Sequence, residues 1–296
     1  MRRSFQGSLV AMVTPFRNGQ VDEAKLGELV DFHVAHGTDG LVPCGTTGES
    51  PTLSHAEHKR VVEIVIEQAA GRIPVVAGTG SNSTAEAIEM TVHAARAGAT
   101  GALLVSPYYN KPTQDGLYRH FRAIAEAAPD LPLIVYNIQS RTAVNVETET
   151  LARLAEIPNI VGVKEASGSL DQMTAVVLAC GPEFSVLSGD DSLTLPLMAV
   201  GGRGIISVLA NFMPREVAEL THAALDGDWK RARELHWKLY PVCKALFIET
   251  NPIPVKEAMA MLGLIQAEWR LPMCPMSDGN RERLRKILVQ AGVVRA

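Results

Sequence analysis

The sequence alternates eight times between a short apolar run and a longer stretch with the spacing of a helix. Each run has about the length of a β-strand, and most are apolar at nearly every position, which is typical of strands covered on both faces of a parallel sheet. The eight predicted strands span residues 8–13, 40–44, 74–77, 101–106, 133–136, 160–164, 184–187 and 204–208. This alternation restricts the chain to the α/β folds.

The stretches between the strands carry helix start signals. Ser54 with Glu57, and Ser83 with Glu86, have the spacing of a capping box, which marks a helix that begins soon after a strand and its loop. Eight strand–helix units match the count of a (β/α)8 TIM barrel. A doubly wound sheet is the competing fold, but no G-x-G-x-x-G follows the first strand, so its dinucleotide-binding form loses its best support.

The strand pattern stops near residue 227. Beyond it, the spacing predicts helices over residues 229–246, 254–262 and 278–291, with prolines between them. A length of 296 residues fits either two equal domains or one barrel with an appendage. Because all eight strands precede residue 227, we predict a catalytic barrel over residues 1–227 and an all-helical domain over residues 228–296.

Composition excludes several classes of partner. With 28 basic and 32 acidic residues, the chain has no basic excess with which to bind nucleic acid. The N-terminus lacks the apolar core of a signal peptide, and no run is long enough to span a membrane. The four cysteines lie far apart and predict free, buried thiols rather than disulfides or a zinc site: Cys44, Cys180, Cys243 and Cys274. We therefore expect a soluble cytoplasmic protein.

Lys164 is the one lysine within the apolar strands, near the end of the sixth. Side chains alternate along a strand, so Gly162 and Lys164 should face one way, and Val161 and Val163 the other. Inside the barrel a desolvated amine favours its neutral form, which attacks a carbonyl to make a Schiff base. The alternative is a lysine that extends out of the strand end or pairs with a carboxylate.

Tyr136 and Arg141 follow the same logic at the end of the fifth strand. In barrels the working residues lie at the carboxyl ends of strands and in the loops that follow them. There a tyrosine hydroxyl can carry a proton, and the arginine fork can bind a carboxylate. The alternatives are a core aromatic residue and a solvated loop charge.

The loop after the second strand reads GTTGES over residues 45–50. Its glycines expose backbone N–H groups that can hold a small carboxylate, and the Thr46 and Thr47 hydroxyls can relay protons. The alternative is an ordinary turn. Tyr108 and Tyr109 follow the fourth strand, and neighbouring strand residues point opposite ways, so at most one should face a site. Together these residues predict a Schiff-base reaction on a small oxo acid.

Two other patterns carry less weight. His33 with His36, and His55 with His58, have a helical spacing that can bind metal, but the sequence lacks H-E-x-x-H. The GGRG segment at residues 201–204 resembles a phosphate loop, yet it precedes its strand, at the opposite end from the barrel mouth. We expect a turn there, and no metal site.

Six motifs, in the same order along the chain, resemble the dihydrodipicolinate synthase family. They are GTTGES (45–50), YYNKP (108–112), YNIQSRT (136–142), VKEA (163–166), LSGDD (187–191) and NPIPVK (251–256). The resemblance covers nearly the whole chain, including the helical tail. It implies a (β/α)8 barrel with a C-terminal helical domain, usually assembled as a homotetramer.

The resemblance also implies a reaction, a step of diaminopimelate and lysine biosynthesis catalysed by a lyase. Lys164 would form a Schiff base with pyruvate, and the enamine would attack L-aspartate 4-semialdehyde before cyclisation. No metal or organic cofactor is expected, because the imine is the electron sink. The implied roles are a proton relay of Tyr136, Thr46 and a neighbouring subunit's Tyr109, pyruvate binding by Thr46 and Thr47, semialdehyde binding by Arg141, and a site lined by Gly189 and Ile206.

In relatives that are inhibited by lysine, lysine binds at a subunit interface. The matching positions here are Ser50, Pro51, His55, His58, Asn82, Glu86 and Tyr108. Two residues depart from the family pattern. Pro51 stands where relatives often have alanine, and Gln139 stands where many have proline, which would leave the loop that carries Arg141 freer.

Two other readings stay open. N-acetylneuraminate lyases and 2-keto-3-deoxy sugar acid aldolases would share Lys164 and Tyr136 without needing Arg141. A non-catalytic protein that binds oxo acids could keep the same fold. The SRT segment at residues 140–142 and the paired threonines favour the synthase.

Overall fold

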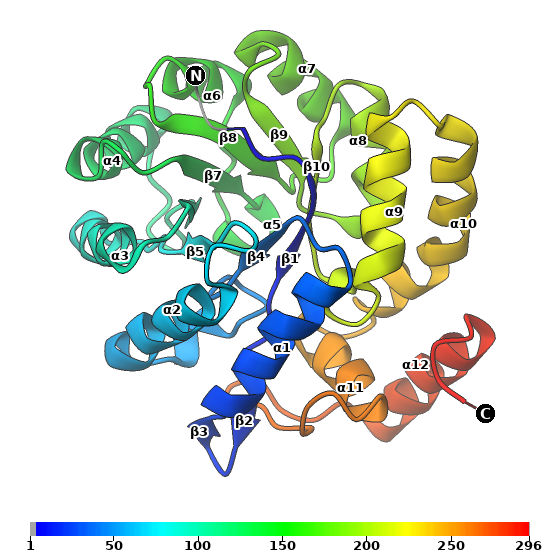
Figure 1. Cartoon of the computed structure of the whole chain (residues 1–296). Coiled ribbons are helices and arrows are strands. Elements are labelled where there is room, and N and C mark those ends of the chain that lie inside the picture. The colour runs from blue at the N-terminus through cyan, green and yellow to red at the C-terminus, as the bar shows by residue number, and fades with distance from the viewer. Residues whose placement is uncertain (1–3, 296) are drawn as a thin grey trace.

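A closed barrel of eight parallel strands forms the centre of the molecule (Figure 1). The computed structural model describes residues 4–295, so the basic start of the chain, Met1 to Arg3, lies outside it. The strands are β1 (Gly7–Ala11), β4 (Gly40–Val42), β5 (Val76–Gly78), β6 (Gly101–Val105), β7 (Leu133–Asn137), β8 (Ile160–Glu165), β9 (Ser185–Ser188) and β10 (Gly204–Ser207). Their order is β4-β1-β10-β9-β8-β7-β6-β5, and a bridge from Leu41 to Val75 closes the ring. The predicted barrel is confirmed.

Helices surround the barrel. They are α1 (Glu23–Ala35), α2 (His55–Ala69), α3 (Thr84–Ala97), α4 (Gln114–Ala127), α6 (Thr148–Ala155), α7 (Leu170–Cys180), α8 (Thr194–Ala199) and α9 (Pro214–Leu225). Ser54 and Glu57 form a complete capping box at α2. At α3 only half of the box forms: Ser83 caps the helix, but the Glu86 carboxylate binds Ser81 and His55 instead. A small hairpin, β2 (Phe16–Arg17) and β3 (Gln20–Val21), was not predicted.

The chain ends in three helices, α10 (Trp229–Ala245), α11 (Ile253–Met261) and α12 (Asp278–Gln290), and α10 packs beside α9 (Figure 1). Gly227, with φ of +81°, makes the turn between α9 and α10. The largest apolar cluster joins barrel and tail, because Val10 and Leu26 share it with Leu239, Val255 and Leu284. We propose the division at residue 227 as a change of architecture, with one core shared by both parts.

Strand side chains divide between the barrel interior and the layer under the helices. Lys164 pairs in register with Tyr136 and Leu187, which both belong to the interior cluster, while Val163 packs against the helices. The expected alternation is wrong at Val161, which packs in the interior cluster. The register between β7 and β8 shifts at this point, so β8 contains one extra residue and Val161 turns inward.

The cysteines are less buried than the sequence predicts. All four cysteines are free, and Cys44 and Cys243 are buried as expected, but Cys180 is only half-buried and Cys274 is exposed. Among the described residues, no helix is both long and apolar enough to cross a membrane.

The loop after α11 is fastened to α2 by a bidentate ion pair. Both Glu57 oxygens accept hydrogen bonds from Arg270, at 2.6 and 3.0 Å. This contact, with a smaller contribution from the Ser54 cap, lowers the pKa of Glu57 from 4.5 to about 2. A carboxyl whose pKa is depressed in the folded state stabilises the fold above its ordinary pKa, and that contribution is lost as the pH falls toward 2.

Glu57→Gln should therefore cost about 1 kcal/mol of unfolding free energy at pH 7, a value reduced for solvent screening. Glutamine keeps the capping box, so the substitution removes the charge alone. Urea denaturation at several pH values measures the difference between variant and parent, which should shrink from pH 4.5 down to pH 2. Parallel stability profiles across that range would contradict the prediction.

Candidate active site

Lys164 lies in the barrel interior, facing the ring of Tyr136 on the neighbouring strand. Its side chain is 4% exposed, and its Nζ lies 4.4 Å from the ring centroid. Within residues 4–295 the amine makes no hydrogen bond and no ion pair. The alternative of a lysine paired with a carboxylate is thus contradicted. A lysine this little exposed, with an amine that no protein group holds, has no evident structural role.

Gly189 leaves the space that the Lys164 stem occupies. A Cβ at this position would lie 3.1 Å from Lys164 Cε and 2.5 Å from Ala166 Cβ. Ile206 on β10 belongs to the same interior cluster as Tyr136. The structure therefore places both predicted lining residues on the barrel side that holds the lysine.

Gly189→Ala should displace the Lys164 amine and slow imine formation with pyruvate by about 100-fold, since a misplacement of about 1 Å can cost that much. Stopped-flow or quenched borohydride trapping measures the rate. Gly279→Ala is a matched control, because a Cβ there meets nothing within 4 Å. An unchanged trapping rate in the Gly189 variant would show that the lysine stem has room to move.

The loop over residues 45–50, predicted to bind a substrate carboxylate and called the carboxylate loop below, is a tight turn held in a strained conformation. The N–H groups of Gly48 and Glu49 donate to the carbonyls of Gly45 and Thr46, each at 3.1 Å. Cys44 and Glu49, at the two ends, have positive φ angles of 56° and 52°. Each such residue costs about 1–3 kcal/mol and persists only where its surroundings enforce it, which is common at functional sites.

Within this loop Thr46 is half-buried and Thr47 is buried. The Thr47 hydroxyl accepts a hydrogen bond from Asn251 Nδ2 at 3.0 Å, from the segment that leads into α11. Asn251 is buried, and its Oδ1 has no hydrogen-bond partner. Asn251 begins the NPIPVK motif, but no role in the site was predicted for it.

Arg141 lies on α5 (Gln139–Thr142), directly after β7. One of its N–H groups donates to the Asn251 carbonyl at 3.2 Å, so the rest of the guanidinium is available. Gln139 is the first residue of this turn, a position that proline also fits. The Thr142 hydroxyl lies 3.0 Å from the Ile138 carbonyl, and Ala143 closes the turn onto the Gln139 carbonyl. These hydrogen bonds order the loop without a proline.

A cavity of about 400 Å³ opens at this end of the barrel. It brings together nine predicted residues: Thr46, Tyr136, Arg141, Ser50, Pro51, His55, His58, Glu86 and Tyr108. Lys164, Thr47, Gly189, Ile206 and Asn82 are not among the lining residues. Lys164 and Asn82 each contact a residue that lines the cavity. Lys164 lies against the Tyr136 ring, and the Asn82 side chain donates a hydrogen bond to the Tyr108 carbonyl at 3.2 Å.

The two tyrosines after β6 separate as predicted. Tyr108 lines the cavity, whereas Tyr109 is 90% exposed and lines no part of it. They are not strand residues: the segment bends, and Tyr109 has a φ of 72°. Tyr109 therefore lies outside the cavity of its own subunit, and the site of a neighbouring subunit, to which it was assigned, stays a prediction.

Six of the seven predicted lysine-site residues line the same cavity, Asn82 being the exception. His55 Nε2 lies 2.6 Å from Glu86 Oε1, and Ser81 also donates to Glu86. His58 Nε2 lies 2.7 Å from the Gly78 carbonyl and donates to it. Burial lowers the pKa of His58, so the ring is neutral at pH 7. The described residues include no cluster of three or more metal-ligating side chains.

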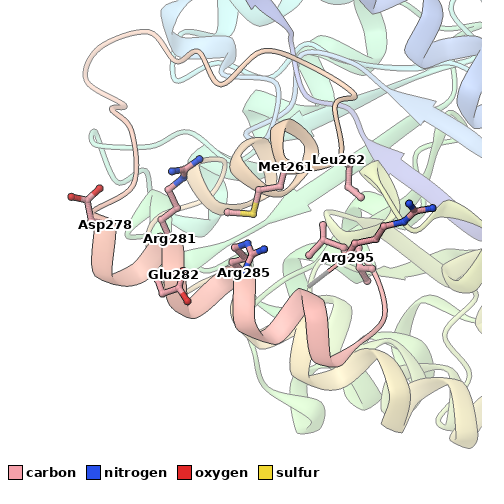
Figure 2. A pocket seen from close by; sticks show the side chains of 9 residues that line it. Met261, Leu262, Asp278, Arg281, Glu282, Arg285 and Arg295 are labelled. Atoms are coloured by element: carbon pink, nitrogen blue, oxygen red, sulfur yellow. The ribbon is translucent and has the colours of Figure 1, made fainter.

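A second, larger cavity of about 700 Å³ lies between α11, α12 and the residues that follow α12 (Figure 2). Figure 2 shows Arg281, Glu282 and Arg285 along α12, opposite Met261 of α11. None of its lining residues belongs to the predicted site. The candidate active site is therefore the smaller cavity, which Thr46, Tyr136 and Arg141 line and beside which Lys164 lies against the Tyr136 ring.

The chain is similar to one known protein family over nearly its whole length. The model of the dihydrodipicolinate synthetase family matches residues 4–291. A 4-hydroxy-tetrahydrodipicolinate synthase of Syntrophobacter fumaroxidans is 57% identical over 98% of this chain and 100% of its own.

Two solved structures of such enzymes superpose closely. The dihydrodipicolinate synthase of Acinetobacter baumannii, complexed with pyruvate, is 48% identical with a TM-score of 0.96, over 98% of this chain and 100% of its own. The enzyme of Cyanidioschyzon merolae, with lysine bound, is 42% identical with a TM-score of 0.95, over 99% of this chain and 100% of its own.

Proposed function

We propose, since this chain belongs to the dihydrodipicolinate synthetase family, that Lys164 condenses pyruvate with L-aspartate 4-semialdehyde. The protein is a lyase of diaminopimelate and lysine biosynthesis, a 4-hydroxy-tetrahydrodipicolinate synthase. The observation that carries the assignment of Lys164 is the unpartnered amine of an almost fully buried residue, placed against the Tyr136 ring.

The reaction begins with attack of the Lys164 amine on the keto carbon of pyruvate. Loss of water gives the imine, and loss of a methyl proton gives the enamine. The enamine carbon then attacks the aldehyde of the second substrate. Finally the amino group of that substrate attacks the imine carbon, which closes the ring and frees Lys164. The imine serves as electron sink, so the proposed reaction calls for no metal or organic cofactor.

Each remaining residue has a part in this proposal. Tyr136 and Thr46 carry protons, with Tyr109 completing the relay in the site of a neighbouring subunit. The exposure of Tyr109, and its absence from its own cavity, support that assignment. Thr46 and Thr47 hold the pyruvate carboxylate, and Arg141 at the mouth holds that of the semialdehyde.

Assembly and regulation belong to the same proposal. We infer a cytoplasmic homotetramer that exchanges Tyr109 between subunits and binds lysine at Ser50, Pro51, His55, His58, Asn82, Glu86 and Tyr108. Light scattering should report four subunits, and calorimetry should detect lysine at millimolar concentration or below. No heat of binding at that concentration would remove the regulatory site. A monomer with full activity would remove the Tyr109 exchange.

A coupled assay with pyruvate and aspartate semialdehyde tests the activity, with and without lysine. Borohydride reduction in the presence of pyruvate should leave a covalent adduct on Lys164, detected by mass spectrometry. Faster turnover of N-acetylneuraminate or a 2-keto-3-deoxy sugar acid would favour another aldolase of the superfamily. Absence of any adduct would leave only the non-catalytic alternative.

A further inference from the structure

We propose that Glu49 and Lys256, a buried ion pair between the carboxylate loop and α11, are positioning residues for Thr46 and Thr47. Lys256 Nζ lies 2.5 Å from Glu49 Oε1, and the two side chains are 0% and 1% exposed. They are separated by 207 residues in sequence. The inference rests on the proposed function, because it assigns the helical tail a part in binding pyruvate.

The surroundings of the pair fix both charged groups. The second Glu49 oxygen accepts a hydrogen bond from the Arg270 backbone N–H at 3.2 Å. The Lys256 ammonium lies 4.3 Å from the ring centroid of Phe16. Apolar residues of similar volume often give the same stability as a buried ion pair, so such a pair calls for a more specific role.

That role is visible in the loop itself. Glu49 is held at positive φ, and its N–H donates to the Thr46 carbonyl. An interaction is needed to hold a side-chain-bearing residue in this conformation, and the buried ion pair is positioned to supply it. When Glu49 relaxes to a more common conformation, the turn that presents Thr46 and Thr47 opens.

A second contact from the same segment points to the same role. Asn251, five residues before Lys256, donates to the Thr47 hydroxyl and also accepts from Arg141. Because the Thr47 oxygen already accepts a hydrogen bond, its own proton is directed elsewhere and is available to a substrate carboxylate. The residues leading into and along α11 thus hold the loop at two points.

The test compares Lys256→Met, Glu49→Gln and the double variant with a matched control. Glu257, the next residue of α11, pairs with Arg281 of α12 at 2.6 Å, and among the described residues no hydrogen bond or ion pair joins its side chain to the loop. Glu257→Gln/Arg281→Met therefore breaks an ion pair on the same helix and should lower stability alone. Glu49→Gln keeps the shape of the side chain and covers the case in which Lys256→Met does not fold.

Three readouts are needed at a temperature where every variant is folded. The KM for pyruvate should rise at least about tenfold in Lys256→Met, while borohydride trapping at saturating pyruvate is retained. Peptides over residues 43–53 should exchange amide hydrogen at least about tenfold faster than in the parent. The double variant should bind pyruvate better than Lys256→Met, because no unpaired buried charge remains.

The pair is merely structural if pyruvate KM and loop exchange stay within twofold of the parent in the folded variants. The same conclusion follows if the control changes them equally. Hydrogen exchange measures the loop without any substrate, so it separates this inference from the proposed function. A parent protein that forms no pyruvate adduct overturns the function, whereas an unchanged loop overturns the positioning role.

Discussion

Lys164→Met abolishes the borohydride-trapped pyruvate adduct and lowers kcat/KM by at least about 10³-fold, as expected for loss of a covalent nucleophile. Methionine keeps the apolar stem that fills the barrel beside Gly189, so the interior stays packed. Mass spectrometry after reduction measures the adduct, and the coupled assay measures the rate.

The same variant should be at least as stable as the parent. Lys164 is 4% exposed and its amine has no partner among the described residues, so an apolar side chain of similar length breaks no hydrogen bond or ion pair there. Thermal denaturation of Lys164→Met should show an unchanged or higher Tm. Stability gained with activity lost is the pattern of a residue kept for chemistry alone.

Lys230→Met is the control for this substitution. Lys230 is exposed on α10 and forms no ion pair with another described residue, so its loss should change neither the adduct nor the Tm. Two results would contradict the role of Lys164. One is a pyruvate adduct that persists in Lys164→Met, and the other is a fall in Tm that accounts for the lost activity by unfolding.

The barrel could be predicted because its strands are apolar and buried on both faces, and because its helices begin at recognisable caps. The same logic brought Lys164 and Tyr136 together, since the carboxyl ends of parallel strands share one edge. The bulge at Val161 could not be read from alternation, because a register shift depends on the partner strand. The hairpin at β2 and β3 has strands too short to show a period, although Asn18 and Gly19 are its typical turn residues.

Less of the site than of the fold could be predicted from the sequence. Local patterns pointed to residues at strand ends, but Asn251 and Lys256 act on partners more than 200 residues away in sequence. Nothing in a single sequence pairs a buried lysine on a helix with a glutamate in a distant loop. The NPIPVK motif was the available signal, and it named the segment without showing what the segment holds.

Arg141→Ala should lower kcat/KM for aspartate semialdehyde by about 100-fold and leave pyruvate trapping on Lys164 unchanged. One N–H group of the guanidinium donates a hydrogen bond to the Asn251 carbonyl, so its other N–H groups can bind a carboxylate at the mouth. Initial rates over a range of semialdehyde concentration measure the loss. Arg141→Lys should recover only part of the rate, because an ammonium keeps the charge without the paired donors.

Ser140→Ala supplies the matched control, since Ser140 is the exposed neighbour of Arg141 on the same short turn. Its rates with both substrates should match those of the parent. If Arg141→Ala slowed imine formation as much as the overall reaction, the arginine would serve pyruvate and not the semialdehyde. If Arg141→Ala changed neither the rate of imine formation nor the overall rate, then the second substrate would not bind Arg141 through a carboxylate. That result is expected for a sugar acid aldolase. The fall in the rate of imine formation, compared with the fall in the overall rate, therefore decides which substrate the mouth of the barrel recognises.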